Sequence, residues 1–215
     1  MNEFTMRLNS GGPGAARASP RRRLNSYNLV MEPRQSVELA KAYLLMNHGP
    51  VTLVSCAHGD RRNVMAASWT MPVDFMPPKV AVVIDRNTLT RELVEASGQF
   101  VLNIPPRRLA KAVLQCGSIS GRQCDKFAAY GLSTAPGTAV GAPLLGGCIA
   151  WLECLVLPEP EIQKRHDVFL GEVVAAWADP RVFRDGRWHF KQAMESTIHY
   201  RAGGHFFATG EPFEV

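Results

Sequence analysis

The stretch "NVMAASWT", residues 63–70, carries small side chains where a strand usually carries bulky ones. Ala66, Ala67 and Ser68 follow one another directly, and small residues in a strand indicate that something approaches the backbone closely. That neighbour could be another strand at a barrel corner or a flat ligand. For a ligand, Asn63 offers an amide that can donate hydrogen bonds.

The residues after this run leave more alternatives open. Trp69 could form one wall of a ligand slot or fill the core, and Thr70 offers a hydroxyl to a polar part of a ligand. The prolines of "MPVDFMPP", residues 71–78, indicate a loop that ends the strand.

Two other segments carry groups suited to an anion. In "DRNTLT", residues 85–90, Arg86 offers a fork of donors, and Thr88 stands at a predicted helix start, where free N–H groups favour negative charge. The alternative is an ordinary N-capped helix beside a solvated arginine. In "CGSISGRQC", Ser118 and Ser120 lie among glycines, including Gly121, just before another predicted helix.

Serine hydrolase and metal chemistry are disfavoured. The middle position of "GSISG" is Ile119, so the segment is not a GxSxG nucleophile elbow. The sequence contains neither HExxH nor CxxC, and we expect no metal site built from protein ligands. Its five cysteines are odd in number and sit mostly in apolar surroundings, which indicates reduced, buried thiols in a cytoplasmic protein.

The charge is concentrated at the N-terminus. The chain has 215 residues and a net charge of +5, but residues 1–35 hold six arginines against two glutamates. The remaining residues carry 18 positive and 17 negative side chains, so a basic nucleic-acid-binding face is not expected. We predict a disordered basic tail over 1–35 and one folded domain over 36–215, with no signal peptide and no membrane span.

Hydrophobic periodicity and turn residues predict many strands in adjacent hairpins, with short helices between them. The strands are expected at 50–57, 64–70, 80–85, 99–104, 148–157 and 166–178, with a further hairpin at 181–190. The helices are expected at 36–47, 88–97, 108–117 and 122–131, and a surface loop at 133–147. This order favours an α+β, mainly β fold: an antiparallel barrel with short peripheral helices.

The quoted segments together resemble a known family. "NVMAASWTMPVDFMPPKVAVVIDRNTLTRELVEASGQFVLNIP" is similar to the core of the flavin reductase-like domain, a family that includes flavoredoxin and the small reductase components of two-component flavin monooxygenases. The later stretches "CGSISGRQCDKF", "APLLGGCIAWLECLV", "RHDVFLGEVV" and "YRAGGHFFATG" fit the same pattern in the same order. The resemblance covers roughly residues 36–210.

This resemblance implies a split β-barrel that binds FMN, or less often FAD, without a covalent bond and near a homodimer interface. It implies electron transfer through the flavin from NADH or NADPH, or from a protein donor. The cofactor-binding candidates that follow from it are Asn63, Ala66, Ala67, Ser68, Trp69, Thr70, Arg86, Thr88, Ser118, Ser120, Gly121, Lys126 and Phe127. A monooxygenase or redox-protein partner is compatible with the same family.

His166 is the catalytic candidate, because the resemblance places a histidine near the flavin ring and the nicotinamide approach. A histidine there could donate a proton or steady the reduced flavin, since its unperturbed pKa is near 6.5. The alternative for His166 is a surface histidine at the end of a strand. The alternative for Lys126 is a surface Asp–Lys pair on a helix.

Two positions depart from the family pattern. Ala66 stands where a threonine or serine is common, and Arg165 stands where a glycine is common; Arg165 could attract nicotinamide cofactor phosphates. These departures leave open an electron carrier like flavoredoxin without direct NAD(P)H activity, or a flavin-binding protein with a sensing or storage role.

Overall fold

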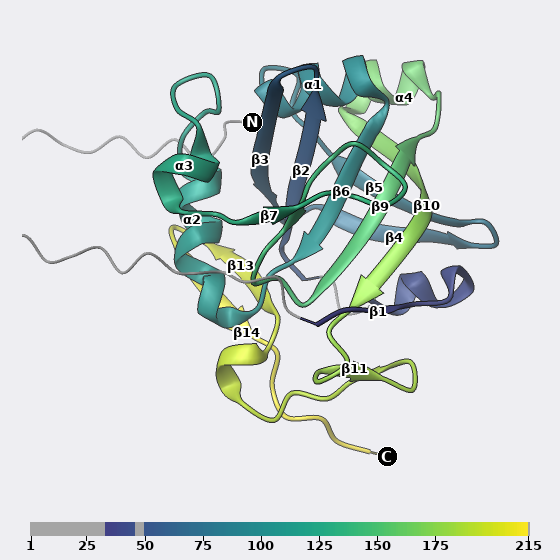
Figure 1. The fold of residues 1–215 in the computed structure, drawn as a ribbon, viewed down its shortest axis with the longest axis vertical. Coiled ribbons are helices and arrows are strands. Elements are labelled where there is room, and N and C mark those ends of the chain that lie inside the picture. The colour runs from purple at the N-terminus through teal and green to yellow at the C-terminus, as the bar shows by residue number, and fades with distance from the viewer. Residues whose placement is uncertain (1–32, 46–49, 215) are drawn as a thin grey trace, which may run out of the picture.

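The computed structural model describes residues 33–45 and 50–214, and within them eight strands form one antiparallel sheet (Figure 1). Along the sheet the order is β3-β2-β6-β9-β10-β5-β4, and β1 pairs separately with β10. These strands are β1 (Gln35–Ser36), β2 (Thr52–His58), β3 (Arg61–Ala67), β4 (Thr70–Phe75), β5 (Pro78–Val83), β6 (Gln99–Ile104), β9 (Ala150–Val156) and β10 (Val168–Ala178).

The other elements are short. The remaining strands are β7 (Thr134–Ala135), β8 (Leu144–Leu145), β11 (Phe183–Arg184), β12 (Arg187–Trp188), β13 (Ile198–Ala202) and β14 (His205–Ala208). The helices are η1 (Leu39–Leu45), α1 (Leu89–Ser97), η2 (Arg107–Leu109), α2 (Ala110–Ser118), α3 (Lys126–Tyr130), α4 (Pro160–His166) and η3 (Ala193–Glu195).

The sheet curls but does not close. β3 and β4 are its two end strands, yet only Ser68 and Trp69 connect them. A link of this length spans at most about 11 Å between the flanking Cα atoms, so the two edges approach at this point. No β3–β4 ladder forms among the described residues. The prediction of an antiparallel split barrel with short peripheral helices is confirmed.

Apolar side chains fill both sides of the curled sheet. The inner core contains Phe100 of β6, Phe169 of β10 and Val82 of β5, all fully buried. A second core lies between the outer face of β2, β3, β6 and β9 and the elements α2, α3 and β13; its largest buried side chain is Trp151. Successive side chains of a strand point to opposite faces of the sheet, so the same strands contribute residues to both cores.

Local signals predicted α1 correctly. The Thr88 hydroxyl caps its first turn by accepting a hydrogen bond from the Arg91 N–H at 3.1 Å. Gly98 ends the helix with φ of 66°, in the left-handed region that glycine adopts without strain. The hairpin of β11 and β12 is confirmed too, and its turn residues Asp185 and Gly186 both have positive φ, as a type I′ turn requires.

Several expected boundaries were wrong. Instead of a helix over 36–47, Gln35 and Ser36 pair with β10, and a 3-10 helix follows at Leu39–Leu45; residues 46 and 47 lie outside the described residues. Gln35, assigned to the basic tail, thus already belongs to the sheet, while residues 1–32 lie outside the described part of the chain. The helix expected at 122–131 begins only at Lys126, because Asp125 caps it.

The segment after Trp69 is a strand rather than a loop. β4 accommodates Pro72 because it is an edge strand, and a register shift between Pro72 and Asp74 absorbs the irregularity. The expected strand over 64–70 is therefore two strands, β3 and β4, divided at Ser68 and Trp69.

The expected surface loop at 133–147 is exposed at 136, 138, 139 and 141, but most of its second half is buried. Ala142 and Leu144 are fully buried, and the cause is the carboxylate of Glu153, which is itself buried. It accepts hydrogen bonds from the N–H groups of Thr138, Ala139 and Val140, from the Thr138 hydroxyl and from the Trp177 indole. Burial alone would raise the pKa of Glu153, but these donors outweigh it and lower the pKa below its ordinary value of 4.5.

We predict that Glu153→Gln lowers stability at pH 7 by about 1.5–3 kcal/mol, because it removes the charge that these donors stabilise. The folded pKa of Glu153 is depressed, so its stabilisation is present above pH 4.5 and is lost as the pH falls through the folded value. Thermal unfolding of both proteins across this range should show their difference shrinking in acid. Glu211→Gln, at an exposed position, is the control; an equal difference at all pH values would contradict the prediction.

Candidate functional site

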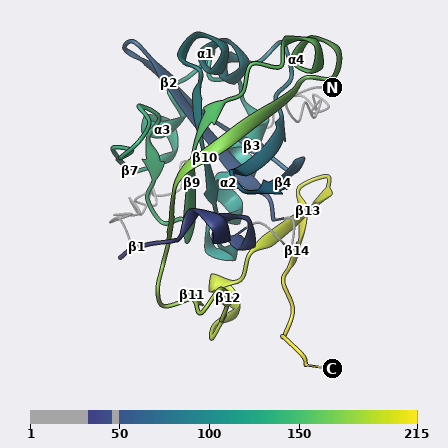
Figure 2. The same ribbon diagram turned by 90° about the vertical axis from the view of Figure 1, so that its right-hand side faces the viewer.

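Strand register gathers distant segments at the split of the sheet. The Val83 N–H donates to the Trp69 carbonyl at 3.1 Å, and Val83 is opposite Val168 of β10. The segments that leave the sheet here are 84–88, which leads into α1, and 166–167, which ends α4. Figures 1 and 2 both show α1 and α4 at this end of the molecule. Trp69, Arg86 and His166 are therefore brought to one corner.

A buried arginine holds α1 and α4 together at this corner. Arg91, which is 6% exposed, lies 3.2 Å from the Asp167 carboxylate and donates to the carbonyls of Ile84 and Gln163. Its guanidinium also lies over the ring of Phe169 at 4.5 Å. A buried charge that is paired and hydrogen-bonded in this way fixes the two helices relative to β10. No local sequence pattern predicts the pairing of Arg91 with Asp167, because the two residues are 76 positions apart.

Arg86 lies on the surface beside this anchor. Its Nη2 donates to the Lys164 carbonyl at 3.2 Å and lies 3.3 Å from Asp167, with 59% of the side chain exposed. Thr88 is fully engaged as a cap, since its hydroxyl also donates to the Asp85 carbonyl at 2.8 Å. The capped helix beside a solvated arginine is thus present, and the anion site remains a prediction.

The three small residues of "NVMAASWT" do not share one surface. Ala66 contacts the second core, while Ala67 belongs to the inner core, because successive strand residues point to opposite faces. Ala66 and Ser68 line a small, mainly apolar pocket. Its other walls come from Val51 and from α2 and the β13–β14 hairpin, with Val113, Leu114, Tyr200 and Phe206. Figure 2 shows this hairpin beside α2.

Asn63 links β3 to two other elements. Its amide donates to the Thr90 hydroxyl of α1 at 2.9 Å, and its side chain lies against Gly121. A methyl group at Gly121 would come within 2.2 Å of the Asn63 Oδ1, so only glycine fits there without a shift. The sequence gives no local signal for the contact between Asn63 and Thr90, because the two residues are 27 positions apart.

The segment around Gly121 is also held to α1 by charge. The Glu92 carboxylate forms ion pairs with the guanidinium groups of Arg61 on β3, at 2.5 Å, and Arg122, at 2.8 Å. Hydrogen bonds from these two arginines lower the pKa of Glu92. Within the same segment the Ser120 hydroxyl accepts from the Arg122 N–H, while the Ser118 hydroxyl donates to the Leu114 carbonyl. Both serines therefore have local partners.

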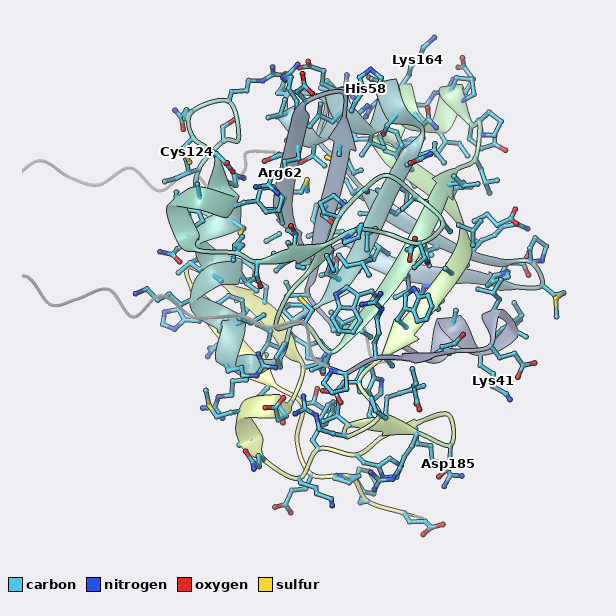
Figure 3. All side chains as sticks on the ribbon, in the orientation of Figure 1. Lys41, His58, Arg62, Cys124, Lys164 and Asp185 are labelled. Carbon is cyan, nitrogen blue, oxygen red and sulfur yellow. The ribbon has the colours of Figure 1, made fainter. Side chains whose placement is uncertain are left out.

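Lys126 is buried and does not form a surface pair. Its ammonium donates to the Cys116 carbonyl at 2.7 Å, which ties α3 to the end of α2, and Asp125 instead caps α3. Burial raises the pKa of the Cys116 thiol to about 12, so it stays protonated. Phe127 is buried too, with the Arg62 guanidinium 4.2 Å from its ring centre; Figure 3 shows Arg62 on the side of β3 that faces α3.

Thr70 provides the observation that most directly concerns a ligand. The residue is 9% exposed, and its hydroxyl oxygen is buried without a hydrogen-bond partner among the described residues. Buried polar groups are almost always paired, so an unpaired one indicates a missing partner such as water or a ligand. The adjacent Trp69 is 56% exposed and does not fill the core.

His166 occupies a different element from the one expected. It is the last residue of α4, and the strand begins only at Val168 because Asp167 ends the helix with φ of 57°. The side chain is exposed, near the corner but outside the two cores.

Among the described residues, no group of three or more His, Cys, Asp and Glu side chains is arranged to hold a metal ion. In the same part of the chain, no helix combines the length and the apolar character needed to cross a membrane.

An open antiparallel sheet, with small residues on one end strand and, among the described residues, an unpartnered Thr70 hydroxyl at its split, defines a split-barrel domain. The family model for the flavin reductase like domain matches residues 46–197, and the chain therefore belongs to this family.

Relatives extend the match over most of the chain. The uncharacterized protein YddH of Escherichia coli (strain K12) is 44% identical over 178 residues, covering 81% of this chain and 94% of YddH. The crystal structure of an FMN-binding domain of a flavin reductases-like enzyme from Shewanella baltica OS155 superposes with a TM-score of 0.83 and 43% identity, covering 86% of this chain and 99% of that one. Flavoredoxin of Desulfovibrio vulgaris (Miyazaki F) gives a TM-score of 0.69 and 29% identity, over 78% and 90% of the two chains.

We predict that Gly121→Ala lowers the unfolding free energy by about 1 kcal/mol, because its methyl group displaces the Asn63 amide from Thr90. Chemical denaturation of the purified variant measures the change. Gly210→Ala is the matched control, since nothing lies within 4 Å of its added methyl group. Equal stability of the two variants would show that the Asn63–Thr90 bond is not constrained by Gly121.

Proposed function

We propose that this protein binds FMN at the corner between β3 and β4 and passes electrons from NADH or NADPH through this non-covalent flavin. The observation that carries the proposal is the unpartnered Thr70 hydroxyl at the split of a flavin reductase-like domain. The 43% identity to an FMN-binding domain over most of both chains supports FMN as the flavin.

The residues at the corner fit such a ligand. Within the described part of the chain β3 pairs with β2 alone, so its outer edge and the adjoining Ser68 leave backbone N–H and C=O groups for the polar edge of a flat ring. Ala66 and Ser68 add little bulk, and Thr70 offers its free hydroxyl. We assign Trp69 to the wall of this slot, because it is too exposed to serve the core.

The phosphate end of the ligand has two candidate contacts in this proposal. Arg86 keeps donors in solvent while Asp167 and the Lys164 carbonyl fix its guanidinium. Asn63 and Gly121 form a second contact region beside α1, where the glycine leaves space for the Asn63 side chain. Lys126 and Phe127 act indirectly, because they position the end of α2 and the side chain of Arg62.

When bound, FMN would supply the redox chemistry by accepting a hydride equivalent and passing on electrons. The protein's part is to hold the ring edge, to exclude water with Trp69 and the β13–β14 hairpin, and to place His166 at the corner. An exposed imidazole there can give or take a proton near the reacting ring.

The function as a carrier is the second candidate. The likeness to flavoredoxin favours a protein that receives electrons from a protein donor rather than directly from a nicotinamide. A monooxygenase component or a redox protein is then the partner that we propose.

Absorption spectroscopy separates the candidates. The purified protein, reconstituted with FMN, is expected to be yellow and to bleach anaerobically with NADH or NADPH. A yellow protein that bleaches only with dithionite is a carrier that needs a protein donor. A protein that stays colourless after incubation with FMN or FAD would refute flavin binding.

We predict that Thr70→Val weakens FMN binding by about 0.5–1.5 kcal/mol, because a hydroxyl reserved for the ligand is lost. The stability of the flavin-free protein should stay equal or rise, since this hydroxyl has no partner among the described residues. Fluorescence titration with FMN and thermal unfolding measure the two effects. Thr134→Val on β7 is the control; an unchanged FMN affinity in Thr70→Val would remove the hydroxyl from the site.

We further propose a homodimer that covers the outer face of β4. Large apolar side chains occupy every second position here: Trp69, directly before β4, and Met71, Val73 and Phe75 on it. Each is at least 45% exposed. Met71 is paired with Ala81 of β5, which is paired with Leu170 of β10, so the apolar surface spans three strands. An exposed apolar face of this kind is typical of an interaction site, and at an edge strand it would otherwise favour aggregation.

We predict that Met71→Glu shifts the protein toward monomers, because the dimer would bury an unpaired charge at a cost of several kcal/mol. Sedimentation over a range of protein concentrations measures the shift. Phe207→Glu changes a side chain that is equally exposed, 58% in both cases, on β14, and it should leave the dimer intact. A wild-type protein that stays monomeric at all concentrations would exclude this interface.

A further inference from the structure

Two exposed cations beside the corner, Lys164 and Arg165, are not used by the proposed flavin site. The last turn of α4 consists of Lys164, Arg165 and His166, all exposed, and Arg86 packs against the Lys164 carbonyl. Figure 3 shows the Lys164 side chain directed away from the rest of the molecule. These residues come from two segments that the register of β5 and β10 places together.

The nearby acids do not neutralise this cluster. Asp167 is 19% exposed, and buried Arg91 shares it with Arg86. The carboxylate of Glu161 lies 3.8 Å from Arg165 with both side chains more than 70% exposed, which is a weak surface pair. The Lys164 and Arg165 side chains thus keep their donors exposed to solvent at this end of α4.

The position of the cluster relative to the corner decides what it can bind. His166 is two residues before Val168 of β10. Val168 is paired with Val83 of β5, and the Val83 N–H donates to the carbonyl of the exposed Trp69. A ligand whose flat ring rests at Trp69 therefore has Arg86 and the end of α4 as cationic surfaces on the same side of the sheet. Nicotinamide dinucleotides have such a ring at one end and an adenosine at the other, and NADPH differs from NADH only by a phosphate on this adenosine.

We propose that Lys164 and Arg165 bind the 2′-phosphate of NADPH and make it the preferred electron donor. The inference rests on the proposed function, because it names the donor for that site. A phosphate monoester offers three acceptor oxygens, which suits a bidentate arginine fork and a mobile lysine ammonium. Basic residues also suit the end of a helix dipole. That effect stabilises α4 alone and gives no preference between two nucleotides.

The test is a binding measurement that needs no turnover. Calorimetry compares adenosine 2′,5′-bisphosphate with 5′-ADP, which has the same number of phosphate groups but none on the 2′-oxygen. The full-length protein is measured with and without FMN. We expect the 2′-phosphorylated ligand to bind roughly ten- to a hundredfold more tightly. The double variant K164Q/R165Q should lose this difference while its FMN affinity stays unchanged.

The control K111Q/R184Q removes two exposed cations elsewhere, on α2 and β11, and should keep the preference. Equal binding of the two nucleotides by the wild type, or a preference retained in K164Q/R165Q, overturns the inference. Both results are independent of flavin binding: a protein that binds FMN but does not distinguish the nucleotides refutes only this inference. A protein that distinguishes them but takes up no flavin refutes only the proposed function.

Discussion

The two-residue link between β3 and β4 is the constraint on which the rest of the structure depends. Ser68 and Trp69 join the opposite ends of a sheet whose other strands lie between them. A link this short forces the sheet to curl until its edges approach, yet the absence of a ladder between them in the described residues leaves a split. The curl encloses the inner core, and the split creates the corner at which the candidate site lies.

Buried charged side chains then fix the helices and loops that surround the curled sheet. Arg91 with Asp167 joins α1 to α4 beside the corner, and Glu153 draws the segment 133–147 onto the second core. Removing one partner of such a group leaves a buried charge uncompensated, so each pair specifies one arrangement of its segments. Lys126 acts similarly between α3 and α2. The corner is thus rigid where it meets the helices, while Trp69, Arg86 and His166 remain accessible.

Sequence reasoning succeeded where a signal was local. The cap at Thr88, the left-handed Gly98 and the Asp185–Gly186 turn depend on neighbouring residues only, and strand β6 was predicted with its observed bounds. It failed where a partner far along the chain decided the outcome. The prolines of β4 suggested a loop, but an edge position makes a strand possible. The alternative of a surface Asp–Lys pair for Lys126 was wrong, because α2 supplies a buried carbonyl for its ammonium.

By itself the sequence determined the family, the antiparallel α+β class and the segments that we propose for the site, because motif order and hydrophobic alternation are properties of the chain. Only the tertiary structure decided how these segments meet. It divided Ala66 from Ala67 between two cores, left the Thr70 hydroxyl without a partner in the described part of the chain, and moved His166 from a strand to the end of a helix. These outcomes depend on strand register and on contacts between residues far apart in sequence, which no local pattern encodes.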